Sequence, residues 1–143
     1  MTDLYRMLYD EGVGFYDERI PEDKPKSAVI HVHRVDCWGV VVDMGRIENT
    51  KEEYSVMLHE CGHYATGTTH AVDSPYDLVE RHENRAERWA VENFISADDL
   101  DAAVADGCTE IWQLAEYFGV TEDLMKKAVC WYTHGNLAAE LYF

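Results

Sequence analysis

Basic residues, paired cysteine motifs and long apolar runs are all scarce in this chain of 143 residues. Lysine and arginine together number 12, against 28 aspartates and glutamates, which gives a formal net charge of −16. A protein with this negative charge repels nucleic acid and anionic membranes, and it attracts cations or a basic partner. A simpler explanation of the acidic composition is that it keeps the protein soluble. No apolar run approaches the ~20 residues of a membrane helix. We therefore expect neither membrane insertion nor direct nucleic-acid binding.

The four cysteines form no C-x-x-C motif, and the first ten residues lack the basic and apolar regions of a secretory signal peptide. These two absences predict free thiols in a reducing cytoplasm. Hydrophobic residues make up 47% of the chain, which argues against disorder. Because no repeat or linker divides it, we expect a single domain over residues 1–143, with a loose tail from about residue 135.

Turn signals and hydrophobic periodicity divide the chain into short strands and helices. Residues 28–35 and 38–44 read as two strands that only two residues separate, which predicts a tight antiparallel hairpin. Helices are expected over residues 2–9, about 51–65, about 79–95, 97–105, 109–118 and about 121–132. This order predicts an α+β fold in which a small antiparallel sheet packs on a helical bundle.

The most informative motif is His59-Glu60-Cys61-Gly62-His63, which has the pattern H-E-x-x-H. Thr50, with Glu53 three residues later, is a capping-box signature, so the motif falls in the last turns of the helix over 51–65. Residues four apart share one helix face, so both imidazoles can bind one metal, and Glu60 can reach a water on that metal. By itself the signal is modest, because a shuffled chain of this composition contains the pattern about one time in thirty.

A hydrolytic zinc site needs three protein ligands and one open position, so a third ligand must come from another element. The next predicted helix carries Glu83 and Glu87, which lie four apart and share a face. We expect Glu83 to bind zinc and Glu87 to contact a ligand histidine, preferably His59, and to fix its tautomer. The alternative third ligands are Asp77, Glu80 and His82.

This ligand spacing resembles that of the thermolysin-like zinc peptidases, whose second motif is E-x-x-x-D at the same distance. More narrowly, the chain resembles the ImmA/IrrE family of metallopeptidases over roughly residues 28–132. The segments that carry the resemblance are Asp43, 50–53, 58–64, 83–90 and 114–124. Two positions depart from the family pattern E-x-x-A-N-x-F-A: Glu87 stands where Asn is usual, which adds a negative charge beside the metal, and Trp89 stands where Phe is usual.

The resemblance implies a small cytoplasmic protein of a bacterium, phage or mobile element. Characterised members cleave a helix-turn-helix repressor that is often encoded next to them. For this chain it implies a zinc endopeptidase with His59, His63 and Glu83 as metal ligands. Glu60 would act as the base that takes a proton from water and delivers it to the leaving amine.

Three points stay open from the sequence. A further donor is needed for the developing oxyanion, and the candidates are His70, Tyr76 and His82. An extended substrate would suit an exposed edge of the 28–44 hairpin by strand addition. The alternative functions are a metal-binding regulatory or interaction protein with little or no peptidase activity, and an acidic adaptor in which the motif is incidental.

Overall fold

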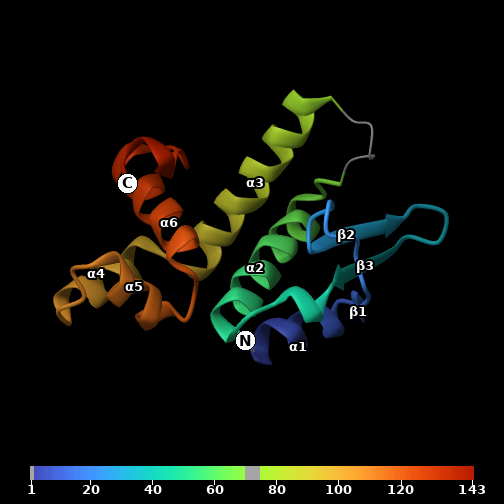
Figure 1. The fold of residues 1–143 in the computed structure, drawn as a ribbon, viewed down its shortest axis with the longest axis horizontal. Helices are drawn as coiled ribbons and strands as arrows, with labels where there is room; N and C mark the ends of the chain where they lie inside the picture. The colour runs from blue at the N-terminus through green and yellow to red at the C-terminus, as the bar shows by residue number, and fades with distance from the viewer. Residues whose placement is uncertain (1, 70–74) are drawn as a thin grey trace.

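The computed structural model describes residues 2–69 and 75–143. The helices of this part are α1 (Thr2–Asp10), α2 (Thr50–Thr66), α3 (Tyr76–Phe94), α4 (Ala97–Ala105), α5 (Ile111–Phe118) and α6 (Glu122–His134). The strands are β1 (Gly14–Asp17), β2 (Ser27–Val32) and β3 (Cys37–Val42), and the 3-10 turns are η1 (Met44–Arg46) and η2 (Ala139–Leu141). In Figure 1, α2 and α3 occupy the centre, with the sheet on one side and α4 to α6 on the other. The predicted α+β fold is confirmed.

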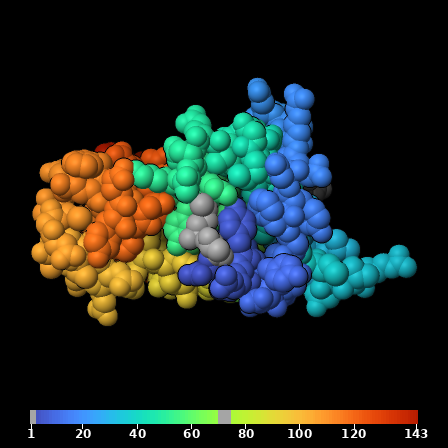
Figure 2. Space-filling model, turned by 90° about the horizontal axis from the view of Figure 1, so that it is seen from below, coloured from blue at the N-terminus to red at the C-terminus, as the bar shows by residue number. Residues whose placement is uncertain are grey.

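The sheet has the strand order β1-β3-β2, so β2 is an edge strand. β2 and β3 pair antiparallel, as predicted, with Ser27 opposite Val42. Their connection is longer than the predicted two-residue turn, because the expected strand residues 33–35 lie in the connection and Asp36 takes a positive φ of 48°. This connection projects from the body of the molecule in Figure 2. β1 was not predicted; it pairs with β3 in parallel.

One hydrophobic core joins the sheet to the helices. Val40 and Val42 of β3 are fully buried. The two valines belong to the same buried cluster as residues of α2 and α3, and α2 packs extensively against α3. The helical members of the cluster at this centre are Met57, Leu58, Cys61, Ala90 and Val91. The sheet and α3 thus hold α2 from two sides.

The ends of α2 are set by its capping residues. The predicted capping box at Thr50 is wrong, because the N-cap is Asn49, whose side chain accepts a hydrogen bond of 2.9 Å from the amide of Glu52. The acidic residues of the first turn suit the positive end of the helix dipole. The helix ends where Gly67 takes a left-handed φ of 65°, a conformation that glycine adopts without a steric penalty.

A glycine lets α2 and α3 approach each other very closely. A Cβ atom at Gly62 would lie 2.2 Å from the carbonyl oxygen of Ala86 on α3, a distance that no side chain tolerates. Gly62 lies inside the H-E-x-x-H motif, and Ala86 lies between Glu83 and Glu87. The contact therefore brings the two predicted site-bearing helix faces together.

The other helices lie close to their predicted ranges. Ser96 and Thr121 cap α4 and α6 through their side chains, and Gly119 ends α5 with a left-handed φ of 69°. α3 begins at Tyr76, three residues before the predicted start. In the described part of the chain, no helix is both long and apolar enough to cross a membrane.

Candidate metal centre

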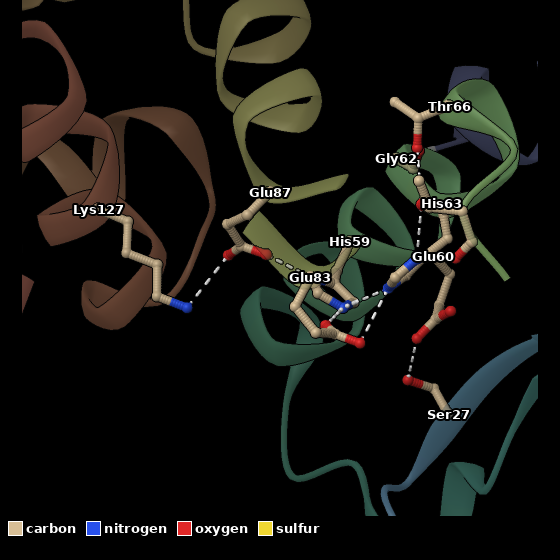
Figure 3. Close-up of polar contacts among 10 residues, drawn as sticks. Ser27, His59, Glu60, Gly62, His63, Thr66, Glu83, Glu87 and Lys127 are labelled. Carbon is tan, nitrogen blue, oxygen red and sulfur yellow. Dashed lines mark hydrogen bonds and ion pairs between the residues drawn. The ribbon is translucent and has the colours of Figure 1, made fainter. Parts of the chain in front are cut away.

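The histidines of the H-E-x-x-H motif and Glu83 converge on one point. The Nε2 atoms of His59 and His63 lie 3.2 Å apart. Glu83 directs one carboxylate oxygen to within 2.7 Å of the first Nε2 and the other to within 3.2 Å of the second. Figure 3 shows the three side chains meeting between α2 and α3. Among the described residues, this is the group whose ligand atoms, all within 4.8 Å of one another, could hold a metal ion.

The spacing of these atoms suits a small tetrahedral cation. Bonds of about 2.0–2.1 Å to a tetrahedral zinc ion place its ligand atoms roughly 3.3 Å from one another. The two imidazole nitrogens, at 3.2 Å, match that separation, and so does the distance from His63 to Glu83. Two imidazoles and one carboxylate are also a donor set that zinc commonly takes. The cluster is therefore a possible metal site.

The rival residues do not join this cluster. Asp77, Glu80 and His82 lie on α3 but outside the group formed with the two histidines. Of the three oxyanion candidates, His70 falls outside the described residues, and Tyr76 is 76% exposed. Neither Tyr76 nor His82 lines the cavity at the cluster. The oxyanion donor thus stays unassigned.

The Nδ1 atom of His63, which faces away from the cluster, is held by Thr68 just beyond the end of α2. This atom lies 2.8 Å from the carbonyl oxygen of Thr68 and 3.0 Å from the hydroxyl. Thr68 is brought back over the helix end because Gly67 turns the chain, and its amide donates to the carbonyl of His63 at 3.0 Å. Sequence reasoning missed Thr68, although the glycine at the helix end was a usable signal.

The outer nitrogen of His59 faces a different partner. Its Nδ1 contacts a carboxylate oxygen of Glu87, the contact that the helical spacing of Glu83 and Glu87 predicted. The second oxygen of Glu87 lies 3.4 Å from the Nζ atom of Lys127 on α6. With Nδ1 occupied in both histidines, each Nε2 can face the cluster. No motif pointed to Lys127, which is distant in sequence.

Proton affinities at the cluster reflect its density of carboxylates. Burial disfavours the imidazolium of His59, but its contacts with Glu83 and Glu87 outweigh that effect and raise its pKa to about 10. Burial acts to raise the pKa of Glu83, yet its contacts with His59 and His63 dominate and hold that pKa far below the usual range. A cation is strongly favoured where these side chains meet.

Glu60 is buried beside the cluster with one oxygen held and the other without a partner. The side chain is 3% exposed, and its Oε1 accepts a hydrogen bond of 2.7 Å from the hydroxyl of Ser27 on β2. Within the described part of the chain, its Oε2 is buried without a hydrogen-bond partner. Burial raises the pKa of Glu60 above the usual value. Ser27 was missed because its contact crosses from the sheet to α2.

Two adjoining hollows open at the cluster. The first, of about 470 Å³, is lined by His59, Glu60, His63 and Glu83 together with the start of β2. The second, of about 480 Å³, lies toward α6 and is lined by Glu87 and Lys127. Both hollows share Lys26, Ser27 and His59, so they lie side by side at the site.

A family model described as the IrrE N-terminal-like domain, Peptidase_M78, matches residues 48–129, which is more than half of the chain. The chain belongs to this family. It is therefore an M78 metallopeptidase domain whose His-His-Glu cluster is its candidate metal site, and the peptidase family implies a protein substrate. The match includes α2, which carries the motif, and leaves out the three strands. No curated protein and no solved structure matches the chain.

Proposed function

We propose that this M78 domain is a zinc-dependent endopeptidase that cleaves a specific regulatory protein, such as a helix-turn-helix repressor. In this proposal His59, His63 and Glu83 hold the zinc ion, and Glu60 is the catalytic base. The observation that carries it is the unpartnered, buried Oε2 of Glu60 beside the His-His-Glu cluster. A buried carboxylate oxygen without a donor is costly, so its retention here argues for a chemical role.

The residues of the chain divide the work of hydrolysis among them. Zinc, when bound, would polarise the scissile carbonyl and lower the pKa of water toward neutrality. Ser27 holds Oε1 of Glu60, which leaves Oε2 to accept a proton from water and then deliver it to the leaving amine. The raised pKa of Glu60 suits the first step, because a carboxylate with a higher pKa accepts a proton from water more readily.

The substrate would lie along β2. This strand is at the edge of the sheet and has β3 as its neighbour on one side only. Ser27, Ala28 and Val29 of β2 line the hollow that contains the cluster. A peptide added to this edge would pair through its backbone, with alternate side chains directed toward this hollow. Strand addition requires an extended segment, so a loop or linker of a folded regulator suits the site better than a helix.

The test compares the parent protein with Glu60→Gln. Each is purified and its zinc content measured, and each is then incubated with a helix-turn-helix repressor encoded beside its gene. We expect about one zinc per chain in both proteins, and cleavage of the repressor by the parent only. His59→Ala and His63→Ala should lose both zinc and cleavage.

Two outcomes would redirect the assignment. If the parent protein and the histidine variants contain equally little zinc, the metal site is wrong. If Glu60→Gln keeps its zinc and still produces the full effect on the regulator in cells, the domain acts as a metal-binding regulatory protein without peptidase activity.

A further inference from the structure

A line of three polar side chains connects the candidate metal centre to the last helix. His59 on α2 contacts Glu87 on α3, and Glu87 contacts Lys127 on α6. The two contacts use different oxygens of Glu87, so one carboxylate bridges the histidine and the lysine. Figure 3 shows Glu87 lying between the other two side chains. The line thus draws on three separate helices.

The bridging carboxylate is buried and needs a positive partner. The side chain of Glu87 is 11% exposed, and a carboxylate at that depth is costly unless it is paired. Within the described residues, Lys127 is the only lysine or arginine in ion-pair contact with it. The contact of 3.4 Å leaves the carboxylate bound on one side by α6 and on the other by His59.

The two histidines of the cluster differ in what holds the Nδ1 atom of each ring. His63 is held by the backbone and hydroxyl of Thr68, five residues further along the same segment. His59 is held by a side chain of another helix, which is itself held by a third. The orientation of His59 is therefore the one that depends on how α6 docks.

We propose that Lys127 is a positioning residue of the metal centre. It fixes the rotamer of Glu87, and Glu87 in turn keeps the ring of His59 turned so that Nε2 faces His63 and Glu83. The docking of α6 then sets the metal affinity of a site built on α2 and α3. This inference rests on the proposed function only in requiring that the cluster binds a metal, and it does not require peptidase activity.

The surroundings of Lys127 make it suitable for substitution. Its side chain is 42% exposed and lines the second hollow beside Glu87, so its removal leaves no buried cavity. Lys127→Met keeps the aliphatic stem and removes the charge, whereas Lys127→Arg keeps a cation. Lys126→Met is the matched control, because it makes the same change on the same helix at a residue that does not line this hollow.

The experiment measures metal binding directly. Each full-length protein is stripped with a chelator and titrated with Zn²⁺ against a chromophoric competitor, and Co²⁺ is added separately to record its d–d absorption. Removing an outer partner of a metal ligand typically weakens binding 10- to 100-fold. We expect Lys127→Met to weaken Zn²⁺ binding by about 10-fold and to shift the Co²⁺ bands. Lys127→Arg should restore most of the affinity, and Lys126→Met should match the parent.

A double substitution tests whether Lys127 acts through Glu87. We expect Glu87→Gln to weaken binding by about 10- to 100-fold, and Glu87→Gln with Lys127→Met to be no weaker than Glu87→Gln alone. Additive losses would overturn the proposal. So would a Lys127→Met protein with the parent's Zn²⁺ affinity and Co²⁺ spectrum, even if its melting temperature falls.

The failure of this inference can be told apart from failure of the proposed function. If the parent protein binds Zn²⁺ but cleaves nothing, the proposed peptidase activity is wrong. The role of Lys127 is then still tested by the Zn²⁺ affinities of the variants. A parent protein that binds neither Zn²⁺ nor Co²⁺ overturns both. If Lys127→Met does not fold, as judged by circular dichroism, Lys127→Gln takes its place in the same titrations.

Discussion

Single side chains from outside the motif hold the residues that carry the proposed chemistry. Ser27 begins β2, lines both hollows and donates a hydrogen bond to Glu60. Its hydroxyl therefore connects the strand on which the substrate would lie with the proposed base. The hydrogen bond also leaves Oε2, rather than Oε1, as the atom without a partner.

We expect Ser27→Ala to reduce turnover by about 10-fold without loss of zinc, because Glu60 would lose the donor that orients it. The measurement is kcat on any protein or peptide that the parent cleaves, together with zinc content. Ser96→Ala is the control, since Ser96 caps α4 away from the site, and its loss costs about 1 kcal/mol of stability. Equal turnover in Ser27→Ala and the parent would show that the hydrogen bond does not position the base.

A second residue-scale prediction concerns the ion pair of Lys26 and Glu52, which ties the segment before β2 to α2. Hydrogen bonding to Lys26 lowers the pKa of Glu52 below its ordinary value of 4.5. A carboxyl group with a lowered folded pKa stabilises the fold fully above its unfolded pKa, and that contribution is lost as the pH falls through the folded pKa. The pair should therefore stabilise the protein at neutral pH and weaken below about pH 4.5.

Chemical denaturation of Glu52→Gln at several pH values measures this effect. We expect a loss of about 0.5–1 kcal/mol at pH 7, a modest value because Lys26 is 38% exposed, and a smaller difference from the parent at pH 3. Glu116→Gln breaks the more exposed pair with Lys51 and should change stability little. A difference that is constant from pH 7 to pH 3 would contradict the assignment.

At the scale of elements, the crossing of α2 and α3 creates the cluster. Gly62 permits the approach, since a Cβ there would meet the carbonyl oxygen of Ala86 at 2.2 Å. Gly62 lies between His59 and His63 in the motif, and Ala86 lies between the two glutamates of α3. A small increase in the separation of the helices would move Glu83 away from the histidines.

Gly62→Ala should therefore weaken zinc binding by at least 10-fold and destabilise the fold by about 1–3 kcal/mol through overpacking. Helix propensity alone gives the opposite sign, because alanine in a helix is favoured over glycine by about 1 kcal/mol. Ala65→Gly, on the exposed side of the same helix, should cost about 1 kcal/mol and leave zinc affinity unchanged. Zinc titration and thermal unfolding of both variants decide between overpacking and helix propensity. A Gly62→Ala protein that is more stable than the parent and keeps its zinc affinity would refute the predicted clash with Ala86.

Local patterns predicted the helices better than the sheet. Caps such as Ser96 and Thr121 act within a few residues, so their signals are visible in the sequence. The cap of α2 was placed one residue too late, because Asn49 and Thr50 are both good capping residues. β1 was missed since four mostly exposed residues show no alternation, and its parallel pairing with β3 depends on a distant strand.

For the molecule as a whole, the parts of the site that could be predicted depend on local helical spacing. The parts that could not be predicted depend on contacts between residues distant in sequence. Helical spacing places His59 beside His63 on α2, and Glu83 beside Glu87 on α3. The close approach of the two helices then brings both pairs together. Ser27 and Lys127 reach the site from β2 and α6 through tertiary packing, for which the sequence holds no local signal.

The same arrangement predicts that metal binding stabilises the whole molecule. A ligand that binds only the folded state stabilises it by about 4 kcal/mol at a concentration of 1,000 Kd, because the unfolded chain cannot compete for it. For a chain of this size, that energy corresponds to a rise in melting temperature of roughly 10 °C. The cluster joins α2 to α3, and those helices carry much of the core, so the gain should extend to the global transition.

Calorimetry with saturating Zn²⁺ and with excess EDTA measures this gain. EDTA should lower the melting temperature of the parent protein by roughly 10 °C, and Zn²⁺ should restore it. His63→Ala should melt at one temperature under both conditions, whereas Glu60→Gln should respond as the parent does, because Glu60 is proposed to act on water and not to bind the metal. An equal response to EDTA in the parent and in His63→Ala would place the stabilising metal somewhere other than between α2 and α3.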